Sequence, residues 1–120
     1  MNVRAAVLYE VKRGPVVEEI TLDDPQQGEV LVKMAATGIC HTDLHVIKGD
    51  TPNLLPVVMG HEGAGIVEKV GPGVTAVQPG DHVVLLAISP CGTCRYCVEG
   101  QPALCQSTVL SNFSGSLYNG

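Results

Sequence analysis

Four of the chain's five cysteines lie within one stretch, residues 91–105, which reads CGTCRYCVEGQPALC. Their spacing is C-x2-C-x2-C-x7-C, and two residues between thiols allow a tight turn or a first helical turn to aim both sulfurs at one centre. Four thiolates bind zinc in a closed tetrahedral site, which leaves no open position for a substrate. The stretch therefore predicts a structural zinc lobe at about residues 89–107, with the ligands Cys91, Cys94, Cys97 and Cys105.

Other roles for this cluster fit less well. Metal-free buried or redox-active cysteines are unusual at this density. Bacterial iron–sulfur proteins continue the C-x2-C-x2-C run with x3-C-P, whereas this chain continues with x7-C and then Gln106. Zinc modules that bind nucleic acid use two cysteine pairs with a longer loop between them. The net charge of −5 also gives no electrostatic reason to bind nucleic acid or an anionic membrane.

The length and composition indicate one domain with an aliphatic core. The chain has 120 residues, of which 45% are hydrophobic and only 3% aromatic. Met1 leads directly into a strand-like segment rather than a signal peptide, and no apolar run approaches the roughly 20 residues that span a bilayer. Five cysteines, an odd number, suit metal ligands better than a disulfide framework. We therefore expect a cytoplasmic, reducing location and no membrane partner.

Short apolar segments separated by Gly and Pro predict a mainly β fold. We expect strands at residues 3–9, 16–22, 29–35, 63–70 and 81–88, with a helix at residues 42–48 that ends at Gly49. Residues 71–76, GPGVTA, fit a dinucleotide-binding pattern, but Pro79-Gly80 follows too soon for a helix, so we predict a turn. Repeated short strands favour a barrel-like domain with short helices in its loops.

The fifth cysteine and one histidine form a second candidate site. Cys40 lies in GICHTDLH and His61 in GHEGAG, and neither has a nearby companion that would close a structural site. The flanking glycines allow close backbone approach. Taken singly, however, Cys40 also fits a small core residue and His61 a hydrogen-bonded polar group. The residue pattern alone leaves both interpretations open.

Several motifs of the chain occur in the order in which a known family has them. GHEGAG at residues 60–65, followed by Gly71 and Val74, matches the zinc signature G-H-E-x2-G-x5-G-x2-V. GICHTD, PGDHV at residues 79–83 and the four-cysteine lobe also occur in the expected order. Over residues 3–105 the chain resembles the N-terminal GroES-like domain of zinc-dependent medium-chain alcohol dehydrogenases, with a leaning toward the class III-like and nitrosoaniline-dependent bacterial branches. The resemblance implies a partly open, GroES-like β-barrel with short helices and a zinc-binding lobe.

The resemblance also implies a second, catalytic zinc site. Cys40 and His61 would be two of its ligands, and the carboxylate of Glu62 would approach the metal when its coordination changes. Asp43 would accept a hydrogen bond from the other ring nitrogen of His61. The family's third protein ligand is a cysteine further along the chain, and no cysteine follows Cys105.

The same resemblance implies a proton path and a cofactor contact. Thr42 would take the proton of the substrate hydroxyl, and His45 would pass it toward solvent. His41 would face the pyrophosphate of NAD. The implied reaction is the zinc-assisted oxidation of a small alcohol to an aldehyde or ketone, with hydride transfer to NAD.

We expect residues 1–120 to be the N-terminal part of such an enzyme, with the nucleotide-binding Rossmann domain absent and no activity from this chain alone. The intact enzyme is expected to form homo-oligomers. Two other functions remain open: a stand-alone zinc-stabilised β module that binds a protein partner, and a storage or redox role for the thiolate cluster.

Overall fold

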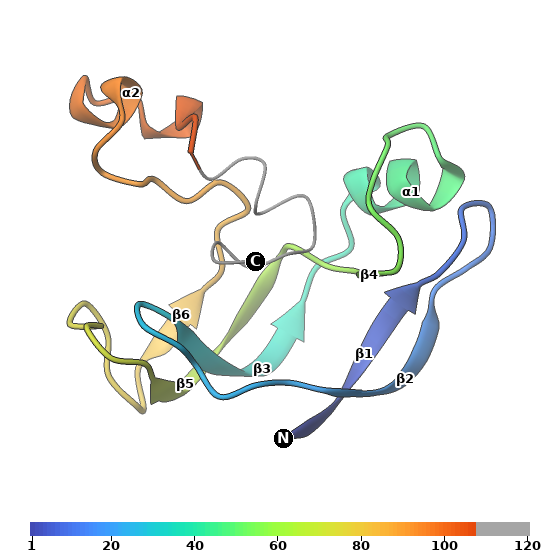
Figure 1. The fold of residues 1–120 in the computed structure, drawn as a ribbon, viewed down its shortest axis with the longest axis horizontal. Coiled ribbons are helices and arrows are strands. Elements are labelled where there is room, and N and C mark those ends of the chain that lie inside the picture. Colours follow the sequence, from blue (N-terminus) through green and yellow to red (C-terminus); the bar gives the residue numbers. More distant parts are fainter. Residues whose placement is uncertain (108–120) are drawn as a thin grey trace.

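The computed structural model describes residues 1–107 and contains two antiparallel sheets of three strands each (Figure 1). In the first sheet the strand order is β2-β1-β4, and in the second it is β3-β5-β6. The bounds are β1 Asn2–Leu8, β2 Val16–Thr21, β3 Val30–Thr37, β4 Val57–Val58, β5 Gly63–Val70 and β6 His82–Val84. The helical elements are α1 His41–Lys48, α2 Arg95–Val98 and the 3-10 helix η1 Pro102–Leu104.

The first sheet is a hairpin with a short third strand. β1 pairs with β2 from Asn2↔Thr21 to Val7↔Val16, and Leu8 then pairs with Val57 of β4. Val7, Leu8 and Val57 are buried and form the apolar centre of this sheet. Because β4 has only two residues, it has no strand-length sequence pattern, and the sequence does not predict it.

The second sheet is organised around β5. Along this strand Gly63, Gly65 and Val67 are buried and alternate with less buried neighbours, as expected for a strand with one covered face. Gly65 has to be glycine, because a Cβ atom there would collide with the backbone carbonyl of Lys33 on β3. The β3–β5 pairing has irregularities between Leu31 and Val32 and between Met34 and Ala36. These interrupt the simple two-residue alternation that the sequence of β3 predicts.

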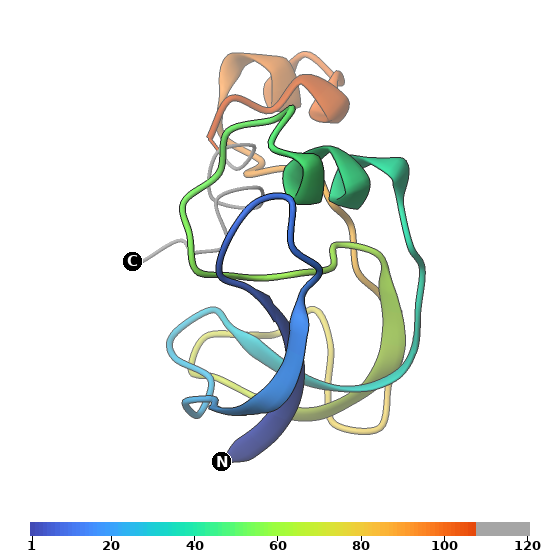
Figure 2. The same cartoon turned by 90° about the vertical axis from the view of Figure 1, so that its right-hand side faces the viewer.

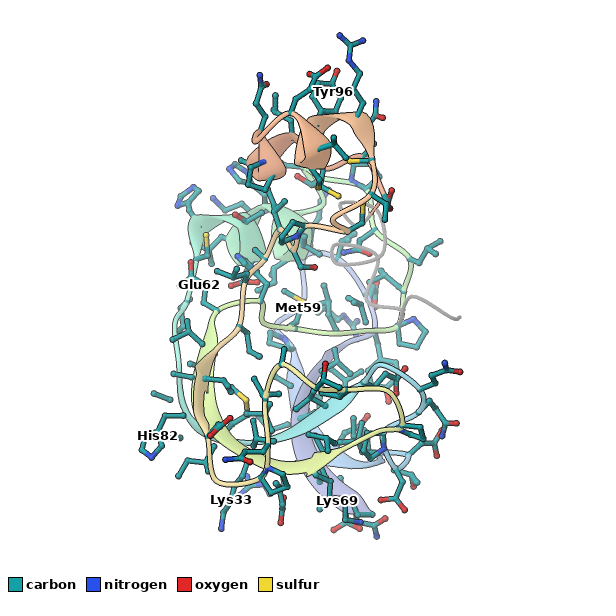
Figure 3. The ribbon with its side chains drawn as sticks, turned by 90° about the vertical axis from the view of Figure 1, so that its left-hand side faces the viewer. Lys33, Met59, Glu62, Lys69, His82 and Tyr96 are labelled. Carbon is teal, nitrogen blue, oxygen red and sulfur yellow. The ribbon has the colours of Figure 1, made fainter. Side chains whose placement is uncertain are left out.

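The helix α1 and the cysteine lobe lie at the same end of the molecule, away from the N-terminus (Figures 1 and 2). The lobe consists of α2, η1 and the turns between them, and these two elements contact each other. Figure 3 shows Tyr96 at the outer tip of the lobe and Glu62 near the end of the second sheet. The two candidate metal centres therefore lie on different parts of the fold.

The mainly β prediction is confirmed, and the two sheets do not close into a barrel among residues 1–107. The predicted helix is confirmed with Gly49 at its end, and residues 71–81 form turns rather than a helix. The prediction of a strand over residues 81–88 was too long. Val84, the last residue of β6, pairs with Ala64 near the start of β5. The residues after Val84 therefore have no partner strand, and the chain continues from there to the cysteine lobe.

None of the described helices combines the length and apolar character that crossing a membrane requires.

Candidate metal centres

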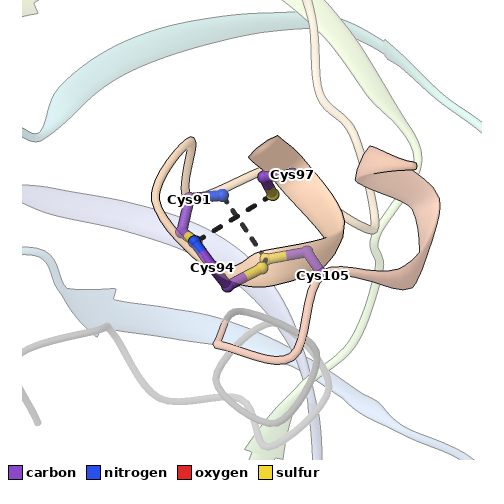
Figure 4. A group of neighbouring side chains, drawn as sticks. All are labelled: Cys91, Cys94, Cys97 and Cys105. Carbon is purple, nitrogen blue, oxygen red and sulfur yellow. Dashed lines mark hydrogen bonds between the residues drawn. The ribbon is translucent and has the colours of Figure 1, made fainter. Parts of the chain in front are cut away.

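The four predicted lobe cysteines converge on one point (Figure 4). Cys94 and Cys97 lie at the start and within the single turn of α2, and Cys105 directly follows η1. The Sγ atoms of Cys91 and Cys97 are 4.0 Å apart, as are those of Cys94 and Cys105, and all four sulfurs lie within 4.8 Å of one another. The lobe is therefore built so that two short helical turns aim their thiols inward.

These distances fit a zinc ion. Zinc–sulfur bonds of about 2.3 Å place the sulfurs of a tetrahedral site about 3.8 Å apart. The two separations of 4.0 Å are close to that value. Hydrogen-bond donors in the lobe also point at the sulfurs: the hydroxyl of Thr93 donates to the sulfur of Cys91 at 3.5 Å, and two backbone amides donate as well. The amide of Cys94 donates to the sulfur of Cys91 at 3.3 Å, and the amide of Cys91 donates to the sulfur of Cys105 at 3.4 Å. Such donors favour thiolates, the form that binds metal.

The thiols of the lobe differ in acidity. Hydrogen bonds from the hydroxyl and amide of Thr93, with the amide of Cys94 and the hydroxyl of Ser107, lower the pKa of Cys91 to about 5. Burial, together with hydrogen bonds to the neighbouring thiols, raises the pKa of Cys97 to about 11. At neutral pH Cys91 is therefore already a thiolate, whereas Cys97 has to release a proton when it binds a metal. Metal uptake by the lobe is consequently linked to proton release.

The second centre joins two segments that are distant in sequence. Cys40 follows the end of β3 by three residues, and His61 and Glu62 directly precede β5. Because β3 and β5 are antiparallel neighbours that pair at Thr37↔Gly63, these segments meet at the same end of the sheet. The carbonyl of Glu62 accepts hydrogen bonds from the Thr37 hydroxyl at 2.7 Å and the Gly38 amide at 3.0 Å, which hold the two segments together.

A thiol, an imidazole and a carboxylate meet there. The ligand atoms of Cys40, His61 and Glu62 lie within 4.8 Å of one another. Gly38 leaves room for this arrangement, because a Cβ atom at that position would collide with the carboxylate of Glu62. Three protein ligands with space for a further group are typical of a catalytic rather than a structural zinc site. The donor set therefore fits a zinc ion with an open position.

Asp43 supports both predicted ligands from the first turn of α1. Its Oδ1 atom lies 3.2 Å from Nδ1 of His61, and both side chains are largely covered, with exposed fractions of 14% and 16%. Its Oδ2 atom accepts a hydrogen bond from the amide of Cys40 at 3.1 Å. Because Nδ1 contacts Asp43, Nε2 is the ring nitrogen of His61 that would bind a metal. One carboxylate thus links the cysteine and the histidine of the second centre.

The other predicted residues lie along α1. The Thr42 hydroxyl lies 3.0 Å from the sulfur of Cys40, next to the second centre. The rings of His41 and His45 meet edge to face, with centroids 4.8 Å apart. His45 also contacts Asp50, a residue that the sequence analysis did not single out. The sequence contains a signal for this contact, because Asp50 directly follows Gly49, the glycine that ends the helix.

A cleft of about 610 Å³ opens beside this centre. It runs between β1 and β3 and reaches His61 and Glu62, and most of its other lining residues are apolar: Ala5, Ala6, Met34, Val58, Met59 and Leu85. Two of the candidate ligands of the second centre, His61 and Glu62, are therefore accessible from an apolar groove, in contrast to the closed cluster of sulfurs in the lobe.

Comparison with known proteins gives a consistent result. Residues 26–120 match the family described as the alcohol dehydrogenase GroES-like domain. The chain is 54% identical over 112 residues to an NDMA-dependent alcohol dehydrogenase of Amycolatopsis methanolica, which covers 92% of this chain and 30% of the relative. It is 50% identical to an S-(hydroxymethyl)glutathione dehydrogenase of Synechocystis, which covers 100% of this chain and 33% of that protein.

Solved structures agree with these relatives. The benzyl alcohol dehydrogenase of Acinetobacter calcoaceticus superposes with a TM-score of 0.90 at 44% identity, over 100% of this chain and 33% of that one. An alcohol dehydrogenase zinc-binding domain protein from Burkholderia ambifaria gives a TM-score of 0.91 at 42% identity, over 100% of this chain and 32% of that one. The chain spans about a third of the length of the proteins it matches.

Proposed function

Because this chain belongs to the family of alcohol dehydrogenase GroES-like domains, we propose that it forms the amino-terminal, zinc-binding part of an NAD-dependent alcohol dehydrogenase. The observation that carries this proposal is the meeting of Cys40, His61 and Glu62 at one point beside Asp43 and Thr42. The proposed reaction is the oxidation of a small alcohol to an aldehyde or ketone. NAD is the proposed hydride acceptor, supplied with a nucleotide-binding domain outside residues 1–120.

The two centres have different proposed roles. The four cysteines of the lobe hold a structural zinc, and Cys40 and His61 hold a catalytic one, with Glu62 as a carboxylate that can approach it. Zinc bound at the second centre supplies a Lewis acid that makes an alcohol hydroxyl easier to deprotonate. Asp43 fixes the orientation of His61 and the start of α1, so that the ligands keep their positions during turnover.

The proposed proton path begins at Thr42, whose hydroxyl is adjacent to Cys40, and continues to His45 one turn later on α1. His45 is half-exposed, so it can release a proton to water. His41 is exposed at the start of the same helix, where a positively charged or hydrogen-bonding ring can contact the NAD pyrophosphate. All three residues lie on the helix that follows Cys40.

The location and assembly are part of the same proposal. Five free cysteines, four of them in a metal-binding lobe, suit the reducing conditions of the cytoplasm. Copies of the intact enzyme are proposed to associate as homo-oligomers, with a small alcohol or aldehyde as the only other partner.

Steady-state kinetics of the protein expressed from its complete reading frame test the function. With zinc present, we expect alcohol-dependent NADH formation, or alcohol-dependent reduction of NDMA as the external acceptor. Cys40→Ala and His61→Ala should abolish turnover while the circular dichroism spectrum stays unchanged. Turnover that survives both substitutions would show that the second centre is not catalytic.

A further inference from the structure

His45 is paired with an acidic residue that lies just beyond its own helix. The Nδ1 atom of His45 is 3.2 Å from Oδ2 of Asp50, and the two side chains are 45% and 56% exposed. A carboxylate accepts hydrogen bonds and donates none, so the ring nitrogen must be the donor. The neutral imidazole then carries its hydrogen on Nδ1 and its lone pair on Nε2. The contact therefore selects one tautomer of His45.

The backbone brings the two residues together. The amide of Asp50 donates to the carbonyl of His45 at 2.9 Å, and the amide of Gly49 donates to the carbonyl of Val46 at 3.1 Å. Gly49 has a φ of 82°, and this combination is the Schellman motif that ends many helices. Asp50 is thus joined to His45 through its main chain as well as its side chain. The helix end therefore places Asp50 within reach of the His45 ring.

Neighbouring segments hold this helix end in place. The amide of Lys12, in the loop after β1, donates to the carbonyl of Ile47 at 2.6 Å, and the side chain of Val11 packs against Gly49. On the other side of the histidine, the ring of His41 contacts the His45 ring edge to face, with an interplanar angle of 73°. The loop after β1 therefore supports the helix end, and His41 packs against the half-exposed His45 ring.

We propose that Asp50 is a positioning residue for proton transfer by His45, through its hydrogen bond to Nδ1. This inference rests on the proposed function, in which His45 receives the proton that leaves the substrate through Thr42. The incoming proton forms an N–H bond at Nε2 while Nδ1–H stays bonded to Asp50. That Nε2–H bond then breaks, the proton passes to water, and the ring returns to its starting tautomer. Without Asp50 the ring can place its hydrogen on Nε2, where it blocks the acceptor.

The tautomer can be measured without any turnover. In the zinc-loaded protein labelled with ¹⁵N-histidine, two-bond ¹H–¹⁵N correlation spectra at about pH 9, where an ordinary imidazole is neutral, distinguish the two ring nitrogens. We expect His45 to be mainly Nδ1–H, and Asp50→Ala to shift it mainly to Nε2–H. Asp23→Ala removes an exposed aspartate in the loop after β2 and should leave the spectrum unchanged. A His45 that is mainly Nε2–H in the unsubstituted protein, or that ignores Asp50→Ala, would overturn the inference.

Kinetics of the protein from the complete reading frame test the consequence. General acid–base groups contribute roughly 10²- to 10⁴-fold to rate, and a partner that sets only the tautomer contributes part of this. We therefore expect Asp50→Ala to slow hydride transfer about tenfold in single-turnover experiments and to leave the steady-state KM unchanged. Asp50→Glu should restore most of the rate. Because alanine keeps the amide that bonds His45, the helix end should remain intact, as its thermal unfolding can verify.

The outcomes separate this inference from the proposed function. If His45→Ala slows hydride transfer but Asp50→Ala does not, the positioning role of Asp50 is wrong and the relay stands. If His45→Ala has no effect while NADH still forms, both the relay and the role of Asp50 are wrong, but the dehydrogenase activity stands. If no alcohol-dependent reduction occurs at all, the proposed function is wrong, whatever the tautomer of His45.

Discussion

The two candidate metal centres are built in opposite ways. The lobe takes its four ligands from 15 consecutive residues, 91–105, and its helical elements are only four and three residues long. The second centre takes Cys40 from the segment after β3 and His61 and Glu62 from the segment before β5, so the sheet positions it. In the lobe the cysteine side chains themselves form the centre of the structure. The sheets that carry the second centre have an apolar core that does not include its candidate ligands.

This difference teaches what each metal would do for the fold. Helices of one turn are not stable alone, and within the described residues Cys105 is the only buried apolar residue of the lobe. A zinc ion bound by the four cysteines would therefore supply much of the folding free energy of that region. The sheets, by contrast, bury Val7, Leu8, Val57 and Val67 and hold the second centre through main-chain pairing. Loss of the second metal should change chemistry more than structure.

The largest expected effect comes from Cys105→Ser, which removes the buried sulfur of the lobe. Structural zinc contributes on the order of 10 kcal/mol to the folding of small zinc modules. We expect the substitution to cost most of this contribution, so that residues 91–105 lose hydrogen-exchange protection and the protein loses one zinc. Metal analysis and exchange mass spectrometry measure both quantities.

Cys40→Ser provides the matched control for this comparison, because it removes one sulfur from the second centre. It should lower zinc binding at that centre but leave exchange protection in β3 and β5 unchanged. Equal loss of structure in the two variants would contradict the distinction between the centres.

Gly65→Ala tests whether the sheet supports the second centre. An alanine Cβ would collide with the carbonyl of Lys33 and the side chain of Val32, and overpacking of this kind costs about 1–3 kcal/mol. We expect a lower thermal midpoint and weaker zinc binding at Cys40 and His61, with lobe zinc retained. Gly14→Ala is the control, since its Cβ would meet no atom within 4 Å. Equal midpoints for the two variants would refute the packing argument.

Asp43→Ala should affect the chemistry of the second centre more than its fold. The substitution removes the partner of His61 Nδ1 and the acceptor of the Cys40 amide. Partners of this kind are worth about 10- to 100-fold in metal affinity. Competition titration with a chromophoric chelator should show that loss at the second centre only. Asp43→Asn keeps an oxygen that can accept from the Cys40 amide, so it should lower the zinc affinity less. An unchanged affinity in both variants would show that Asp43 does not support the second centre.

The sequence predicted the two centres with different completeness, for a physical reason. Ligands that are close along the chain leave a spacing pattern, so Cys91, Cys94, Cys97 and Cys105 could be assigned together from local geometry. Cys40 and His61 meet only through the β3–β5 pairing, which no local pattern contains. Their grouping needed the family resemblance, and the structure then brought them together with Glu62.

The parts of the fold that the sequence did not predict also depend on contacts between distant segments. The two-residue strand β4 and the early end of β6 depend on which partner strand is available, and neighbouring sequence does not encode this. The irregular pairing of β3 likewise depends on the residues of β5 that lie opposite it. The helix end at Gly49 was predictable because glycine itself favours the left-handed conformation found there.

The smallest effect is expected at the surface pair of Asp24 and Lys69, which tests whether the sheets rely on charge. Asp24 Oδ1 lies 2.8 Å from Lys69 Nζ, and the side chains are 73% and 56% exposed. The hydrogen bond from Lys69 lowers the pKa of Asp24 below its ordinary 3.8, and the same bond raises the pKa of Lys69 above 10.5. The pair therefore stabilises the fold fully between these ordinary values, and its contribution falls as the pH drops through the lowered value or rises through the raised one.

Lys69→Met should consequently lower the thermal midpoint slightly at pH 7, by less than Gly65→Ala, because water and salt screen an exposed pair. The difference in thermal midpoint from the unsubstituted protein should shrink as the pH falls from the ordinary 3.8 through the lowered pKa of Asp24, and it should also shrink in high salt. Lys33→Met, which removes an exposed lysine from β3, should show no such pH dependence. A loss of thermal midpoint as large as that of Gly65→Ala would mean that charge, rather than strand pairing and packing, stabilises the sheets that carry the second centre.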